Sequence, residues 1–147
     1  MALFSLRDTA QDVSQENVEI VRASAAAYIR GDLDATLKDF DPDVVIRPDA
    51  NWPENRPILG VDAARSFVED LMATFGTGET GVESPIDDLI DAGDRVVIRY
   101  RGRVHGQLSG IEDEVVFSQV VTLRRGKVVM LEYFLDHHEA LEATGRE

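Results

Sequence analysis

The first part of the chain has the repeating pattern of an amphipathic helix. Apolar side chains recur every three or four residues from Val18 to Tyr28, so a helix is predicted there. Ser14 suits its N-cap, and Gly31 suits its C-terminal end. Residues 1–13 show no such pattern and are interpreted as a flexible N-terminal lead-in.

Two further helices and one strand are predicted before the middle of the chain. Asp32 can cap a short second helix that carries Phe40 on its apolar face, and a short strand follows at 43–48. The clearest helix begins after Gly60. Its apolar positions repeat at i, i+3, i+4 and i+7, and they are Ala64, Phe67, Val68, Leu71, Met72 and Phe75.

The second half of the chain has the alternating pattern of β-strands instead. The predicted strands are 82–91, 95–105, 112–124 and 127–135, with a glycine-rich loop at 106–110. Asp136 then begins a terminal helix, since Glu139 stands at the spacing of a capping box. Helices followed by a meandering, mostly antiparallel sheet are typical of the α+β class, and we predict one domain over 14–147.

The hairpin between the last two strands allows a residue-by-residue prediction. Arg125 and Gly126 suit the two central positions of its turn. Counting outward with period two, one face is predicted to carry Phe117, Gln119, Val121, Leu123, Met130, Glu132 and Phe134. Glu132 and Gln119 would then lie side by side in an apolar surface. Because a carboxylate is rarely buried without a partner or a function, a site is predicted there.

Five short motifs together suggest a family. They are Ser14-Gln15-Glu16-Asn17-Val18, Arg30-Gly31-Asp32-Leu33-Asp34, Phe40-Asp41-Pro42-Asp43-Val44, Asp91-Ala92-Gly93-Asp94-Arg95 and Glu132-Tyr133-Phe134. With these motifs in this order, the chain resembles the SnoaL-like branch of the nuclear transport factor 2-like superfamily, from about residue 14 to the end. The resemblance implies an α+β cone, in which a strongly curved sheet wraps around helices and leaves an internal pocket. It also implies a homodimer, joined through the outer face of the sheet. Polyketide cyclases, a steroid isomerase, an epoxide hydrolase, dehydratases and non-enzymatic binders share this fold, so the fold alone does not define a function.

The catalytic residues of these relatives match this sequence only in part. The limonene epoxide hydrolase pattern places an arginine on the long strand and a carboxylate on the last strand, which map to Arg99 and Glu132. The aspartate of that pattern is replaced by Arg101, and its tyrosine and asparagine are replaced by Val45 and Arg47. The aspartate base of the steroid isomerase also falls on Arg47. Neither mechanism therefore transfers intact.

The resemblance and the hairpin together define the candidate site. Glu132 is the expected acid or base, and Arg99 is expected to position it or to stabilise an oxyanion. The expected ligand-binding residues are Tyr28, Arg47, Trp52, Arg101, Phe117, Gln119, Met130 and Phe134. The alternative is that Glu132 and Arg99 form a buried ion pair that only stabilises the sheet. Trp52 either lines the pocket mouth or closes the core, and Tyr28 either contacts the ligand or keeps its hydroxyl in water.

Composition and charge narrow the choice of partners. The 147 residues carry a net charge of −13, which disfavours binding to nucleic acids and to anionic membranes. The sequence contains neither a membrane-spanning apolar run nor a signal peptide, so a cytoplasmic location is expected. There are no cysteines, and the adjacent His137 and His138 are poorly placed to chelate one ion. We therefore expect no metal and no cofactor.

Two functions remain open at this point. The first is a cofactor-free isomerase, cyclase, dehydratase or hydrolase that uses acid/base chemistry on a small or polycyclic carbonyl compound. The second is a non-catalytic ligand-binding protein, or a dimeric structural domain with a vestigial pocket. In either case a homodimer is expected through the sheet face opposite the pocket, because that face would be too apolar for a monomer. The residues predicted on that face are Ile98, Val120, Val129, Leu131 and Tyr133.

Overall fold

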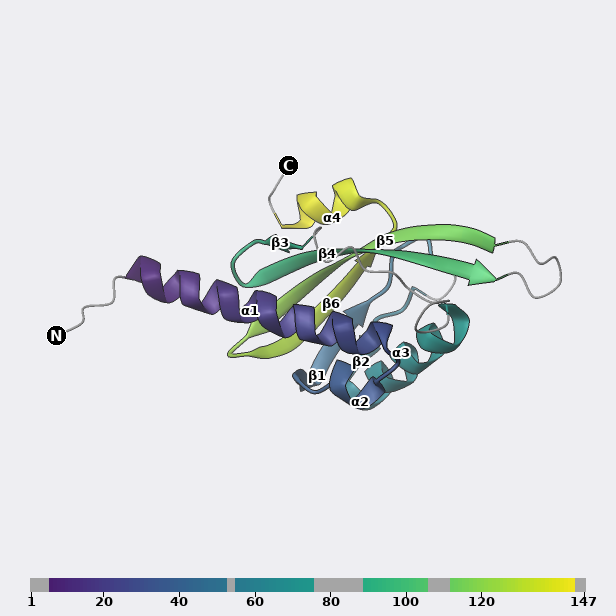
Figure 1. Ribbon diagram of the computed structural model, residues 1–147, viewed down its shortest axis with the longest axis horizontal. Helices are drawn as coiled ribbons and strands as arrows, with labels where there is room; N and C mark the ends of the chain where they lie inside the picture. The colour runs from purple at the N-terminus through teal and green to yellow at the C-terminus, as the bar shows by residue number, and fades with distance from the viewer. Residues whose placement is uncertain (1–5, 53–54, 76–88, 106–111, 145–147) are drawn as a thin grey trace.

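The fold is taken from a computed structural model (Figure 1), which describes residues 6–52, 55–75, 89–105 and 112–144. Residues 1–5 of the predicted lead-in, most of the predicted strand at 82–91 and the predicted loop at 106–110 lie outside the described residues. No helix in the described ranges is long and apolar enough to cross a membrane.

The first helix, α1, is longer than the sequence pattern predicted. It spans Leu6–Ile29, so the prediction that it begins near Ser14 is wrong. No glycine or proline interrupts this segment, and its leucine, arginine, alanine and glutamine residues all favour helix. Its N-terminal half extends past the other elements (Figure 1). Its C-terminal end follows the prediction: Gly31 has a φ of 79°, and its N–H donates to the Tyr28 carbonyl over 3.0 Å.

The remaining helices are α2 (Leu33–Thr36), α3 (Val61–Phe75) and α4 (His137–Ala143). The predicted N-caps of α2 and α4 are confirmed. Asp32 accepts a hydrogen bond from the Ala35 N–H, and Asp136 accepts one from the His138 N–H. The second helix is shorter than expected, because Phe40 begins a strand instead of ending the helix.

The strands form a six-stranded sheet within the described residues, in the order β2-β1-β6-β5-β4-β3. Their bounds are Phe40–Arg47 (β1), Ile58–Leu59 (β2), Ile90–Asp91 (β3), Arg95–His105 (β4), Glu112–Arg124 (β5) and Lys127–Phe134 (β6). β1 runs parallel to β6, and every other pair is antiparallel. Helices packed on a mixed sheet confirm the predicted α+β class.

The helices divide between the two faces of the sheet (Figure 1). The main core lies between the sheet and α1, α2 and α3, and we call this side of the sheet the inner face. Ala140 of α4 packs against Val97 and Val120 on the opposite side, which we call the outer face.

The hairpin between β5 and β6 contains a β-bulge that the sequence pattern did not predict. Arg125 and Gly126 form its turn, with φ angles of 53° and 75°, as predicted. Leu123 pairs with Val128, but Thr122 pairs with Met130, so Val129 is an extra residue in β6. Beyond the bulge every β6 side chain points to the opposite face from the one predicted.

The shifted register separates Glu132 from Gln119. Gln119 pairs with Tyr133, and Glu132 pairs with Val120. The prediction that Gln119 and Glu132 face each other is therefore wrong. The inner face carries Phe117, Gln119, Val121, Leu123, Val128, Leu131 and Tyr133, whereas Ser118, Val120, Thr122, Met130, Glu132 and Phe134 belong to the outer face.

Candidate functional site

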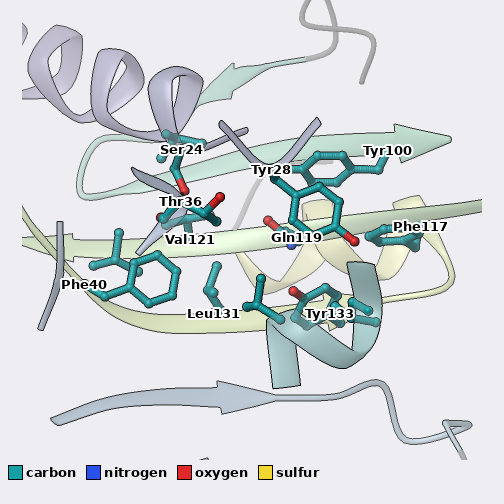
Figure 2. A pocket seen from close by; sticks show the side chains of 14 residues that line it. Ser24, Tyr28, Thr36, Phe40, Tyr100, Phe117, Gln119, Val121, Leu131 and Tyr133 are labelled. Carbon is teal, nitrogen blue, oxygen red and sulfur yellow. Dashed lines mark hydrogen bonds between the residues drawn. The ribbon is translucent and has the colours of Figure 1, made fainter. Parts of the chain in front are cut away.

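A narrow cavity lies between the inner face of the sheet and helices α1 and α3. Its volume, counted as the space open to the centre of a water molecule, is about 40 Å³. Figure 2 shows the 14 side chains that line it, and we call this space the inner cavity. Such a space holds about three water molecules.

Aromatic rings form much of the cavity wall. Tyr100 of β4 stacks on Phe117 of β5, with ring centroids 5.3 Å apart. Tyr28 of α1 lies 6.4 Å from Tyr100, and Tyr133 of β6 lies 6.0 Å from Phe117. These rings come from three neighbouring strands and the helix that crosses them, so the wall is fixed by the sheet register. Rings in such tilted and stacked contacts stabilise one another.

Most polar groups of the inner cavity already have protein partners. The Ser24 hydroxyl donates to the Thr36 carbonyl over 2.8 Å, and the Thr36 hydroxyl donates to the Asp32 carbonyl over 2.7 Å. The Gln119 side chain hydrogen-bonds the Tyr133 hydroxyl. The Tyr28 hydroxyl differs: it is buried and has no hydrogen-bond partner among the described residues. In Figure 2 the Tyr28 ring extends from α1 towards β5.

The tyrosines of the cavity remain uncharged over the physiological pH range. Burial raises the pKa of Tyr28 to about 12. Burial raises the pKa of Tyr100 further, and the nearby Tyr28 adds to the rise. Burial also raises the pKa of Tyr133 well above its usual range, although the hydrogen bond from Gln119 partly opposes this. Each tyrosine can therefore offer a hydroxyl to a ligand but does not act as a base near neutral pH.

Three of the predicted ligand-binding residues line the inner cavity: Tyr28, Phe117 and Gln119. Trp52 lies outside it and lines two neighbouring spaces, a small hollow and a surface cleft. Its backbone N–H donates to the Asp49 carbonyl over 2.9 Å, which places it in the turn after β1.

The other predicted site residues lie on the outer face. Glu132, Met130 and Phe134 were expected in the pocket, and the bulge at Val129 turns all three away from it. The Cα of Arg47 pairs with that of Glu132 in the neighbouring strand, and the Arg47 side chain is exposed. A catalytic role for Glu132 in the inner cavity therefore loses its structural basis.

The orientation predicted for β4 is also wrong. Arg99 was expected to face the pocket, but it pairs with Ser118 on the outer face, and Arg101 follows on the same face. Tyr100, between them, faces the inner cavity. The Arg99 Nε is buried without a partner among the described residues, and the Ser118 Oγ lies 2.7 Å from the His137 Nδ1 of α4. These polar groups belong to the region beneath α4.

Tyr100 and Tyr133 line the cavity, although neither residue was predicted to lie there. A signal for Tyr100 was present, because Val96, Ile98 and Tyr100 form the apolar face of β4 and should face the core. No comparable signal existed for Tyr133, since its orientation depends on the bulge.

Comparisons with known proteins agree with this architecture. A family model described as the SnoaL-like domain matches residues 21–131. None of the curated proteins compared with the chain matches it. Solved structures do match. A nuclear transport factor 2-like protein from Burkholderia thailandensis E264 is 26% identical, with a TM-score of 0.68 over 86% of this chain and 95% of that one.

Two further structures have a similar fold. A proposed SnoaL-like polyketide cyclase from Jannaschia sp. CCS1 is 20% identical, with a TM-score of 0.68 over 100% of this chain and 99% of that one. TerC, crystallised with polyporic acid, is 24% identical, with a TM-score of 0.66 over 88% of this chain and 98% of that one. Because the family model covers most of the sequence and the folds agree, this chain belongs to the SnoaL-like domain family.

Proposed function

We propose that the protein binds a small, uncharged organic molecule in the inner cavity, where the Tyr28 hydroxyl forms a hydrogen bond with an oxygen of that molecule. The observation that carries this proposal is the buried Tyr28 hydroxyl, which has no partner among the described residues. A buried polar group without a partner costs about 1–3 kcal/mol, so it usually has a function or an additional partner.

The lining of the cavity supports an uncharged ligand. No charged side chain lines it among the described residues, and its tyrosines stay protonated. A charged ligand would lose its hydration there without gaining a counter-charge, which is costly. An uncharged molecule with one oxygen loses much less hydration free energy, because the Tyr28 hydroxyl replaces the water that had hydrogen-bonded this oxygen.

The same lining favours binding over acid/base catalysis. A cofactor-free isomerase, cyclase, dehydratase or hydrolase needs a group that exchanges protons near neutral pH. The described lining of the inner cavity contains no carboxylate, imidazole or amine, and Glu132 and Arg99 lie on the outer face. We therefore propose a ligand-binding protein. The structure of TerC with polyporic acid supports small-molecule binding by this fold.

A Tyr28→Phe variant tests the proposal. The ligands are butanone, a small uncharged ketone with one oxygen, and acetate as a charged molecule of similar size. Butanone should bind the unmodified protein, and acetate should not. Loss of the Tyr28 hydroxyl should weaken butanone binding about fivefold to tenfold, the value of one hydrogen bond. Saturation-transfer NMR of the ligands would measure both effects.

Tyr133→Phe is the matched control for this variant. Tyr28→Phe removes an unpaired hydroxyl and should leave the free protein equally stable or more stable. Tyr133→Phe breaks the hydrogen bond to Gln119 and should lower the free energy of unfolding by about 1 kcal/mol. Equal butanone affinity in Tyr28→Phe and the unmodified protein, or tighter binding of acetate than of butanone, would contradict the proposal.

We also propose that the protein forms a homodimer through the outer face of the sheet. The residues differ from those predicted, because Ile98, Leu131 and Tyr133 are buried on the inner face. An apolar row crosses the outer side of three strands instead: Leu59 pairs with Val45, and Val45 pairs with Met130. Leu59 is 69% exposed in the single chain, so a partner would cover it.

Light scattering after size-exclusion chromatography tests the dimer. The unmodified protein should be dimeric at micromolar concentration, and Leu59→Glu should produce monomers because it places a charge in the apolar row. Ser66→Glu, at an exposed position of α3 away from this face, should remain dimeric. A monomeric unmodified protein would exclude the proposed dimer, and so would a Leu59→Glu variant that stays dimeric.

A further inference from the structure

Three spaces lie in series from the protein surface inward, and the inner cavity is the innermost of them. The outermost is a cleft of about 790 Å³ between α3 and the segment around 55–58, and we call it the outer cleft. The middle one is a hollow of about 10 Å³, which has room for at most one water molecule. Trp52 and Phe67 line both the outer cleft and the hollow, and Phe117 and Tyr133 line both the hollow and the inner cavity. Leu71 lines all three spaces.

Four aromatic side chains around the hollow therefore separate the outer cleft from the inner cavity. We call them the aromatic partition, and they are Trp52, Phe67, Phe117 and Tyr133. Phe67 contacts Tyr133 in an edge-to-face arrangement, with ring centroids 5.6 Å apart. Close-packed interiors leave little room for ring motion, so a hollow beside these rings marks the place where one of them can move.

Phe67 is the member of the partition that neither a sheet strand nor the Asp49 turn carries. Phe117 and Tyr133 are buried on adjacent strands of the sheet. Trp52 follows a turn held by Asp49, whose carboxylate accepts the Asn51 N–H over 2.7 Å and the Leu135 N–H over 2.8 Å. Phe67 lies on α3, is only half-buried, and borders the outer cleft directly.

We propose that the inner cavity and the outer cleft form one elongated binding site, and that the Phe67 side chain opens or closes the passage between them. The ligand class is then an elongated, uncharged and mainly apolar molecule, longer than the inner cavity alone can hold. Its inner end carries the oxygen that meets Tyr28, and its middle passes Phe67. Its outer end lies in the outer cleft, which Asn55, Arg56 and Asp70 make more polar. This inference rests on the proposed binding function and adds the length of the ligand to it.

A series of methyl ketones tests the length of the site. Butanone, pentyl methyl ketone and nonyl methyl ketone share the oxygen and differ only in the apolar tail. If the tail passes the partition, affinity should rise about fourfold for each added methylene group, the effect of burying that group. Trp52 is the only tryptophan and borders both the hollow and the outer cleft, so its fluorescence should change with the longer ketones.

Phe67→Ala and Phe67→Leu test the role of the ring, and Phe134→Ala on the outer face is the matched control. Stopped-flow fluorescence should show nonyl methyl ketone associating at least tenfold faster with Phe67→Ala than with the unmodified protein. Phe134→Ala should match the unmodified protein. Leucine fills more of the space than alanine, so Phe67→Leu should bind nonyl methyl ketone at a rate between those of Phe67→Ala and the unmodified protein. Phe67→Leu also serves as the test if Phe67→Ala fails to fold.

Two results would overturn the inference. One is an affinity that stops rising, or falls, once the ketone exceeds the length of the inner cavity. The other is association with both Phe67 variants at the rate of the unmodified protein. Butanone binding distinguishes these results from a failure of the proposed function. If butanone binds and Tyr28→Phe weakens that binding, the proposed function holds and only the elongated site is wrong.

Discussion

An Asp49→Ala variant should lose about 3 kcal/mol of unfolding free energy, because charge-assisted hydrogen bonds are among the strongest in proteins. Asp49 is only 5% exposed, and both of its carboxylate oxygens are used. One oxygen accepts the Asn51 N–H, and the other accepts the Leu135 N–H from the segment after β6. Alanine would leave both N–H groups without this acceptor and would release the turn that carries Trp52.

Urea denaturation would measure this loss, with two variants for comparison. Asp49→Asn retains one acceptor oxygen and should lose about half as much stability as Asp49→Ala. Asp91→Ala removes an exposed carboxylate whose one partner among the described residues is the Gly93 N–H, and it should change stability by less than about 1 kcal/mol. If Asp49→Ala lost no more unfolding free energy than Asp91→Ala, the Asp49 carboxylate would not be a main link between the turn after β1 and the segment after β6.

The features that the sequence predicted correctly depend on neighbouring residues. Gly31 ends α1 because a left-handed residue is needed there, and Asp32 caps α2 through an N–H three positions away. The turn at Arg125 and Gly126 is equally local. Each of these signals lies within a few residues, so the sequence contains all the information needed.

The position of Glu132 could not be predicted in the same way. Val128, Val129, Met130 and Leu131 are all apolar, so either face of β6 could point to the core. The choice is made by the bulge at Val129, which depends on pairing with β5 and also with β1. A one-residue shift moves every later side chain to the other face, and the candidate carboxylate moved with it.

The error in β4 has a different cause. The alternation itself gave two clear faces, one with Val96, Ile98 and Tyr100 and one with Arg99 and Arg101. The resemblance to enzymes with a polar pocket favoured the arginine face, although burying two guanidinium groups costs more than burying a tyrosine. The structure follows the hydrophobic pattern, so this cavity is more aromatic and less charged than the sequence motifs suggested.

The folded protein should show almost no tyrosinate absorbance near pH 10, where tyrosines in an unfolded chain are about half ionised. All 3 tyrosines of the sequence line the inner cavity. Burial raises the pKa of Tyr28 to about 12 and those of Tyr100 and Tyr133 further. The protein in concentrated urea supplies the unfolded comparison, and circular dichroism shows whether the chain is still folded at each pH.

The same pKa shifts set the direction of alkaline unfolding. Above pH ~10 the unfolded chain gives up tyrosine protons that the folded chain keeps, so the free energy of unfolding falls as the pH rises. The tyrosines contribute their full stabilisation below pH ~10. This contribution is lost as the pH rises past the pKa values of the tyrosines in the folded chain, beginning with Tyr28 at about 12. The Tyr28→Phe variant should lack the ionisation of Tyr28 and keep the ionisations of Tyr100 and Tyr133 at higher pH. A folded chain whose tyrosines all ionise near pH ~10 would contradict the burial of these rings in the inner cavity.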